Sequence, residues 1–99
     1  MSAMEKRFDI SEFVDTETEQ SVLADLVKRE RQRRKELRLT QKALSVRSGV
    51  SYASIRRFES TGDISLSSLF KIGNAIGCLP DFNELFKSKK ITNLKDYEA

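Results

Sequence analysis

The sequence contains no histidine and a single cysteine, Cys78, among its 99 residues. Without histidine or a cysteine pair, the common zinc ligand sets cannot be assembled. A single cysteine excludes an internal disulfide framework, fits a reducing cytoplasm, and is most often a small buried apolar side chain. A glycine-rich phosphate loop and a nucleophile with a positioned base are also missing. These absences predict that the protein is not an enzyme and that it needs no metal and no cofactor.

Long apolar runs are missing as well. No segment approaches the roughly 20 apolar residues of a membrane-spanning helix, so no membrane contact is predicted. The first residues carry charge where a secretory signal would have its apolar region. We therefore expect a cytoplasmic protein. Hydrophobic residues make up 38% of the chain and charged residues 33%, which predicts one domain with a small core and a highly charged surface.

Charge is distributed unevenly along the chain, although the net charge is only +3. Residues 1–25 carry a net charge of −5, residues 26–60 carry +8, and residues 61–99 are balanced. A concentrated basic block is the electrostatic signature of a phosphate-binding surface. The middle of the chain therefore indicates a nucleic-acid partner, although much of the block could also be a solvated helix face.

The basic block contains the pattern of two short helices joined by a tight turn. Thr40 and Ser51 are suited to cap helix N-termini, and Gly49 between them can adopt the left-handed conformation that ends a helix. Ile55 and Phe58 are three residues apart and predict the inward side of the second helix. Its outward side would then show Tyr52, Ala53, Arg56, Arg57 and Ser60. This is the pattern of a helix-turn-helix unit.

The unit resembles the DNA-binding motif of the phage-repressor and Cro (XRE) type of regulator. Matching residue types recur at fixed offsets: Leu39-Thr40-Gln41, Leu44, Gly49-Val50-Ser51, Ser54-Ile55 and Glu59. The resemblance implies an all-α, compact five-helix fold of the lambda-repressor type. It also implies double-stranded DNA as the partner, bound by a symmetric homodimer whose third helix enters the major groove of a palindromic operator. Such a protein represses transcription at the nucleoid.

The expected organisation has three parts, namely an acidic arm at residues 1–20, the helix-turn-helix domain at residues 21–87, and a tail at residues 88–99. The arm is either a frayed terminus or a segment that packs on a second subunit or another protein. The tail is either exposed and disordered or forms a short docking helix. That helix would place Ile91, Leu94 and Tyr97 on one side.

Three further helices complete the expected fold. The first runs from about Glu19 to Leu37, and its apolar side is formed by Val22, Leu23, Leu26, Val27 and Leu37. Ser65 or Ser67 caps the fourth, in which Leu66, Leu69, Ile72, Ala75 and Ile76 recur at helical spacing. A short fifth helix opens at Leu79-Pro80-Asp81, with Asp81 and Glu84 at capping-box spacing and Phe82, Leu85 and Phe86 as apolar anchors.

The predicted base-reading residues lie at the exposed start of the third helix: Ser51, Tyr52, Ala53, Ser54, Arg56 and Arg57. Arg57 is the leading candidate, because a guanidinium can bind guanine through O6 and N7. Tyr52 can donate from its hydroxyl or press its ring against a thymine methyl. The alternatives are helix capping for the hydroxyls and solvated charge for the arginines.

Phosphate contacts are expected at the edges of this reading surface. In the family, the glutamine that matches Gln41 bonds to a backbone phosphate. The other candidates are Thr40, Lys42, Ser45 and Arg47, together with Ser65, Ser67 and Lys71 at the front of the fourth helix. Capping or solvated charge remains the alternative for each of them.

The resemblance also implies that Arg34 pairs with Glu59, a buried ion pair that locks the first helix to the third. Two residues depart from the family pattern. Glu30 stands where an apolar residue is usual, which predicts that the first helix is rotated, or longer and more exposed, at that turn. Arg38 stands where glycine or asparagine is usual, so it must take a left-handed conformation or close the helix differently.

A second class of function is a protein-interaction module. The chain is similar to small HipB-like antitoxins, which bind a HipA-type kinase toxin and repress their own operon. That similarity rests on chain size, on Arg33-Arg34-Lys35-Glu36-Leu37 leading into Leu39-Thr40-Gln41, and on the ending Asp81-Phe82-Asn83-Glu84-Leu85-Phe86. The acidic arm or the tail would then contact the toxin. A neighbouring gene for such a kinase would favour this reading.

Overall fold

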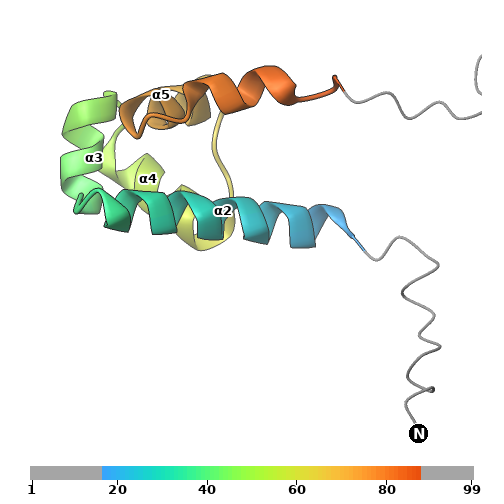
Figure 1. Ribbon diagram of the computed structural model, residues 1–99. Helices are drawn as coiled ribbons and strands as arrows, with labels where there is room; N and C mark the ends of the chain where they lie inside the picture. Colours follow the sequence, from blue (N-terminus) through green and yellow to red (C-terminus); the bar gives the residue numbers. More distant parts are fainter. Residues whose placement is uncertain (1–16, 88–99) are drawn as a thin grey trace, which may run out of the picture.

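The computed structural model describes residues 17–87, and all regular secondary structure within that range is helical. The elements are α2 (Glu19–Glu36), α3 (Gln41–Ser48), α4 (Tyr52–Thr61), α5 (Leu66–Ala75) and the 3-10 helix η2 (Leu79–Glu84). In Figure 1, α2 runs along one side of the molecule, α5 and η2 run along the other, and α3 lies across one end. The expected all-α, five-helix fold is confirmed. Most of the expected arm and the whole tail lie outside the described residues.

The core is a small apolar cluster contributed by α3, α4, α5 and the turns between them. Its members are Leu44, Val50, Ile55, Phe58, Ile72 and Ile76. Half-buried residues pack around it, including Val27 of α2 and Cys78. Burial of one large apolar side chain contributes roughly 1.5–3 kcal/mol, so this cluster sets the relative position of the helices. No helix in the described range has the length and apolarity to span a membrane.

Both ends of α2 are closed by local hydrogen bonds. Thr18 accepts from the backbone N–H of Ser21, and the Ser21 hydroxyl accepts in turn from the N–H of Thr18. The helix therefore begins at Glu19, ahead of the boundary proposed for the domain. At the other end, Arg38 has φ 60°, so the left-handed alternative is the one adopted. Its N–H bonds to the Lys35 carbonyl and the N–H of Leu39 bonds to the Arg34 carbonyl, which is a Schellman motif without glycine.

Glu30 corrects one expectation from the sequence. The predicted rotation or exposure of α2 at this turn is wrong, because Glu30 is only 7% exposed. It lies one turn before Arg34, which is equally buried, and residues four apart share a helix face. Helix α2 therefore has the orientation expected for an apolar residue at this position, and the carboxyl group of Glu30 is buried.

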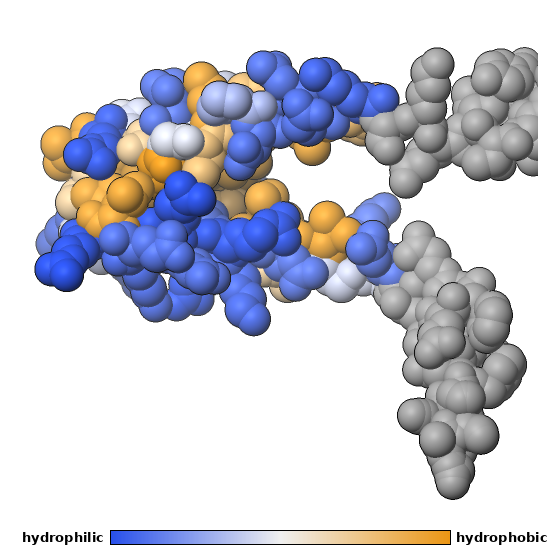
Figure 2. Space-filling view, in the orientation of Figure 1, coloured by the Kyte–Doolittle hydropathy of each residue, from blue (hydrophilic) through white to orange (hydrophobic). Residues whose placement is uncertain are grey.

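Several residues expected on the apolar side of a helix are at the surface instead. Leu66 is 60% exposed, because it is the first residue of α5. Of the residues expected on the apolar side of the first helix, Val22, Leu23 and Leu37 are exposed, and Leu26 and Val27 are half-buried. Figure 2 shows hydrophilic residues over most of α2 and hydrophobic surface near its beginning. The helix extends beyond the core at that end.

The last expected helix is anchored differently than predicted. It is the 3-10 helix η2, preceded by Cys78 without a side-chain cap, so the capping role predicted for Asp81 is wrong. Phe82 does pack inward, with its ring centroid 4.8 Å from that of Phe70. Leu85 and Phe86 do not, because the chain becomes extended at Leu85 and turns to φ 66° at Phe86. Both side chains are exposed, Phe86 completely.

Candidate nucleic-acid interface

The two helices of the helix-turn-helix unit begin at capped N-termini. Thr40 Oγ1 accepts from the N–H of Ala43 at 2.9 Å, and Ser51 Oγ accepts from the N–H of Ser54 at 3.1 Å. Each hydroxyl satisfies an amide that has no partner within the helix. Gly49 between them has φ 81°, the left-handed conformation expected at the end of α3. The expected N-termini of both helices and the expected end of α3 are confirmed.

The turn between α3 and α4 is tied to α3 by two side-chain hydrogen bonds. The hydroxyl of Ser45 donates to the Val50 carbonyl at 2.6 Å, and the N–H of Val50 donates to the Ser48 hydroxyl at 3.1 Å. The Val50 side chain is itself buried in the core. These contacts hold the turn, and with it the angle between the two helices.

The two sides of α4 differ as its sequence predicts. Ile55 and Phe58 are completely buried and attach the helix to the core. Five of the six predicted readers are exposed: Ser51, Tyr52, Ala53, Arg56 and Arg57. Ser54 is half-buried, and its hydroxyl accepts a hydrogen bond from the hydroxyl of the cap Ser51. The exposed side of α4 therefore carries an aromatic ring, a small residue and two guanidinium groups, followed by the hydroxyl of Ser60.

The ring of Tyr52 lies between two cations. Nζ of Lys42 is 5.5 Å from the ring centroid, and Cζ of Arg56 is 5.6 Å from it. At such distances the ring quadrupole attracts a cation by about 0.5–1 kcal/mol on an exposed surface. Tyr52 thus joins a side chain of α3 to a side chain of α4 at the start of α4.

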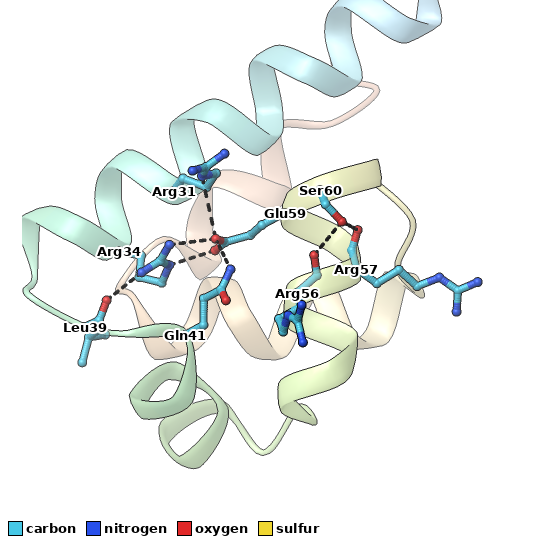
Figure 3. Close-up of polar contacts among 8 residues, drawn as sticks. All are labelled: Arg31, Arg34, Leu39, Gln41, Arg56, Arg57, Glu59 and Ser60. Carbon is cyan, nitrogen blue, oxygen red and sulfur yellow. Dashed lines mark hydrogen bonds and ion pairs between the residues drawn. The ribbon is translucent and has the colours of Figure 1, made fainter.

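Arg57 is directed toward the end of α4. Its Nε lies 3.1 Å from Oδ2 of Asp63, which follows the helix. Figure 3 shows its side chain extending away from Arg56 and from the Glu59 network. The two arginines of the exposed face therefore point to different parts of the surface.

Glu59, at the last turn of α4, is the centre of a buried polar network. Its carboxylate accepts from Arg34 twice, from Nε at 2.9 Å and from Nη2 at 2.8 Å. A third hydrogen bond comes from the side-chain amide of Gln41 at 2.9 Å, and Nε of Arg31 lies 3.9 Å away. The remaining guanidinium nitrogen of Arg34 donates to the Leu39 carbonyl at 2.8 Å (Figure 3). The network joins α2, α3 and α4 at one point.

The network keeps both partners of the ion pair charged. Burial raises the pKa of Glu59, but hydrogen bonds from Arg34, Glu30 and Gln41 lower it by more, so that the pKa lies below its usual value. The hydrogen bond to Glu59 raises the pKa of Arg34, against the opposing effect of burial. A buried ion pair with its hydrogen bonds satisfied adds little net stability, whereas stranding one of its charges is costly.

A shallow depression lies directly above this network. It has a volume of about 560 Å³ and is lined by Arg31, Gln41, Ala53, Arg56, Arg57, Glu59 and Ser60. The structure thus brings Gln41 together with three predicted readers on α4. Arg47, Ser65, Ser67 and Lys71 do not line it. Ser65 instead caps α5 by accepting from the N–H of Ser68 at 3.1 Å, while Ser67 and Lys71 are exposed beside it.

The sequence pattern does not single out Arg31. It is one of six basic residues in the middle of α2, for which a solvated helix face is the simple explanation. Its position three residues before Arg34 was the available signal, because residues three apart share a helix face. Among the described residues, no group of three or more acidic, cysteine or histidine side chains could hold a metal ion.

Comparison with known proteins agrees with this geometry. The family model described as helix-turn-helix matches residues 31–83, which span the end of α2 through most of η2. No curated protein and no solved structure matches the chain. The matched range contains the capped helices, the glycine turn and the exposed face of α4. The chain belongs to the helix-turn-helix family of XRE type, and it is a DNA-binding transcription regulator.

Proposed function

We propose that this regulator is a repressor that binds a palindromic operator as a homodimer, with α4 in the major groove. The observation that carries the proposal is the exposed face of α4, held on a helix whose opposite face is completely buried. A base-reading side chain must be presented by a rigid element, and α4 is joined to α2 and α3 through Glu59. Acting on an operator, the protein would work in the cytoplasm at the nucleoid.

Base reading is assigned to the first turns of α4. Arg56 and Arg57 supply bidentate donors of the kind that bind guanine O6 and N7, and Tyr52 supplies a hydroxyl and a ring edge. Ala53 leaves space between them for a base edge. Ser51 and Ser54 contribute at the N-terminus of the helix, where their hydroxyls already order the first turn.

Phosphate binding is assigned to residues around the reading face. The amide of Gln41 gives one hydrogen to Glu59, and its second hydrogen is available to a phosphate oxygen. Arg31 lines the same depression and can leave its loose contact with Glu59 for a phosphate. Thr40 and Arg47 on α3, with Ser65, Ser67 and Lys71 at the start of α5, would contact the flanking backbone.

A single domain reads only a few base pairs, so useful specificity needs two copies. We place the dimer contact at the end of the described chain, where Leu79, Leu85 and Phe86 leave apolar surface exposed. Apolar burial between subunits would remove these side chains from water. Half-sites would then lie about one helical turn of DNA apart.

The test is a binding titration on the DNA upstream of the gene, compared with a scrambled duplex of the same composition at two salt concentrations. Tight binding of two chains per duplex, with a large preference over the scramble, is the expected result. Weak binding to both duplexes with the same steep salt dependence would mean that only nonspecific phosphate contact occurs. The sequence-specific part of the proposal would then fail.

The exposed aromatic ring of Phe86 also favours a second candidate, an antitoxin that holds a HipA-type kinase toxin and represses its own operon. A completely exposed phenylalanine is unusual outside an interface, and a toxin could cover it as well as a second copy could. Co-purification with a kinase encoded beside the gene, abolished by Phe86→Ser, would support this function. Undisturbed co-purification of the variant would place the contact elsewhere, for example in the arm or the tail.

A further inference from the structure

Glu30 has an uncommon environment for a carboxylate. It is 7% exposed, and neither of its oxygens accepts a hydrogen bond among residues 17–87. It lines a cavity of about 300 Å³ between α2, α5 and η2, next to apolar side chains that include Leu26, Ile72 and Phe82. An ionised carboxylate without partners in such surroundings would cost several kcal/mol, so something must compensate it.

The charged groups around Glu30 come from three elements. On α2 these are Arg31 and Arg34, whose charges favour the ionised form, and Glu59 of α4 opposes them. Arg29, Arg33 and, from η2, Asp81 line the same cavity, as does the thiol of Cys78. Arg34, which is equally buried one turn further along α2, is the candidate counter-ion, but its donors are already given to Glu59 and to the Leu39 carbonyl.

Glu30 and Arg34 are both buried and lie four residues apart on one face of α2, and Arg34 holds the buried carboxylate of Glu59, so the two acids belong to one buried cluster. A hydrogen bond between the two carboxyl groups is one of the causes that raise the pKa of Glu30. Two carboxylates hold only acceptors, so such a bond requires a proton on one of them. Glu59 accepts three hydrogen bonds from Arg34 and Gln41, which stabilise its charged form. Glu30 accepts none. The proton therefore belongs on Glu30.

We propose that Glu30 is a positioning residue that acts as a neutral acid, donating its O–H to Glu59 and holding that carboxylate in place for Arg34 and Gln41. Through these two contacts it keeps α4 fixed to α2 and α3. Its effect on DNA affinity rests on the function proposed above, whereas its effect on the network does not. The family usually has an apolar residue here, so this contact is a property of this chain.

The electrostatics agree with the geometry. Burial, followed by the hydrogen bond to Glu59 and the charge of Glu59, raises the pKa of Glu30 from 4.5 to about 8, against the lowering effects of Arg34 and Arg31. Near neutral pH the acid keeps its proton. When that proton is lost, two buried carboxylates compete for the one guanidinium of Arg34, and the connection between α2 and α4 loosens.

The experiment is an NMR titration of the full chain from about pH 5 to about pH 9, which follows the side-chain carboxyl carbon of Glu30 and the Nε–H signal of Arg34. We expect Glu30 to titrate near pH 8 and the Arg34 signal to weaken over the same range. In Glu30→Gln, whose amide can still donate to Glu59, the Arg34 signal should persist throughout. In Glu30→Leu, which cannot donate, it should be weakened at every pH. A Glu30 titration near 4.5, or an Arg34 signal that is the same in all three proteins, would overturn the proposal.

Operator affinity gives the second readout. At pH 9 only about a tenth of the molecules keep a proton that dissociates near pH 8, so apparent affinity should fall roughly tenfold between pH 7 and pH 9. The operator affinity of Glu30→Gln should fall over this range only by the general pH dependence of DNA binding. Equal losses in both proteins would overturn the role of Glu30 in binding. If neither protein binds DNA at any pH, the proposed function fails, and the NMR titration alone decides whether Glu30 positions Glu59.

Discussion

Arg57 and Asp63 form an ion pair across the end of α4, with Nε of the arginine 3.1 Å from Oδ2 of the aspartate. Both side chains are about two-thirds exposed, so the pair contributes little to the stability of the fold. Its importance lies elsewhere, because the guanidinium assigned to base reading already has a carboxylate partner. To bind guanine, Arg57 must therefore break its ion pair with Asp63.

Replacing Arg57 by alanine should weaken operator binding by ~1–3 kcal/mol and relax the preference at one base position, as the loss of a bidentate contact does. The measurement is a titration against a set of operators with single substitutions. Arg33→Ala is the matched control, because it removes the same charge from a residue paired with Glu36 on α2. An equal loss on operator and random DNA would show that Arg57 contacts only phosphate.

Asp63→Asn should strengthen operator binding, because it frees Arg57 and removes a negative charge near the reading helix. The gain should be modest, below about 1 kcal/mol, since an exposed pair is weak. Salt titrations separate the two causes, because the general charge effect appears on random DNA as well. When Asp63→Asn is combined with Arg57→Ala, the increase in affinity for the operator should be no larger than the increase in affinity for random DNA. Persistence of the full operator gain would refute a competition between Asp63 and the base.

Arg34→Ala should lower the free energy of unfolding by ~3–5 kcal/mol, because it strands the buried charge of Glu59. A domain of this size has little more stability than that to lose. Urea unfolding followed by circular dichroism measures the effect, and Arg33→Ala again serves as the control for charge. Replacing both Arg34 and Glu59 with apolar residues should recover much of the loss. A loss below about 1 kcal/mol for the single variant would contradict a buried pair.

The stability of the fold should fall as pH rises toward 8. The pKa of Glu30 is raised to about 8, so its contribution is fully present below the unfolded value of 4.5 and is lost as pH rises through the folded value. The pKa of Glu59 is lowered, so its contribution is lost only as pH falls below 4.5. The free energy of unfolding measured with urea should therefore decline between about pH 5 and about pH 8, by at most roughly 1.4 kcal/mol per pH unit. Glu30→Gln should remove this decline, and an unchanged slope in the variant would assign it to other groups.

Arg38→Gly should stabilise the protein by roughly 0.5–1 kcal/mol. Arg38 occupies the left-handed position of a Schellman motif, where a side chain is strained and glycine is not, and the greater freedom of unfolded glycine offsets part of the gain. Thermal unfolding of the two proteins tests it. Arg38→Ala should be neutral or slightly destabilising, since alanine keeps the strain. If glycine proved no better than alanine, the turn would not be strained.

Phe86→Ser should weaken dimerisation without destabilising the monomer, because the ring is completely exposed in the single chain. Sedimentation equilibrium over a range of concentrations measures the dissociation constant. Phe82→Ser is the contrasting variant, since that ring packs on Phe70 and its loss should destabilise the fold. An unchanged dimer in Phe86→Ser would exclude this end of the chain from the interface.

The local architecture of the helix-turn-helix unit could be predicted from the sequence. Thr40, Gly49 and Ser51 mark the helix ends because capping depends on groups within a few residues along the chain. Ile55 and Phe58 identify the buried side of α4 for a similar reason, since helical periodicity alone decides which residues share a face. The positions of four helices could therefore be predicted closely. The pairing of Arg34 with Glu59 followed from the family resemblance.

The features that the sequence did not predict depend on contacts between distant residues. Burial of Glu30 follows from the orientation that the whole of α2 takes against the core, and local polarity argued for the opposite. Exposure of Leu85 and Phe86 depends on how the chain leaves η2, which no apolar spacing encodes. Arg57 and Asp63 meet only because Gly62 turns the chain at the end of α4. The sequence by itself determined where four helices lie and which side of α4 faces inward, because capping and helical periodicity are local. Tertiary structure alone decided which charges are paired and which acid is buried, because an electrostatic environment is set by every group packed around it.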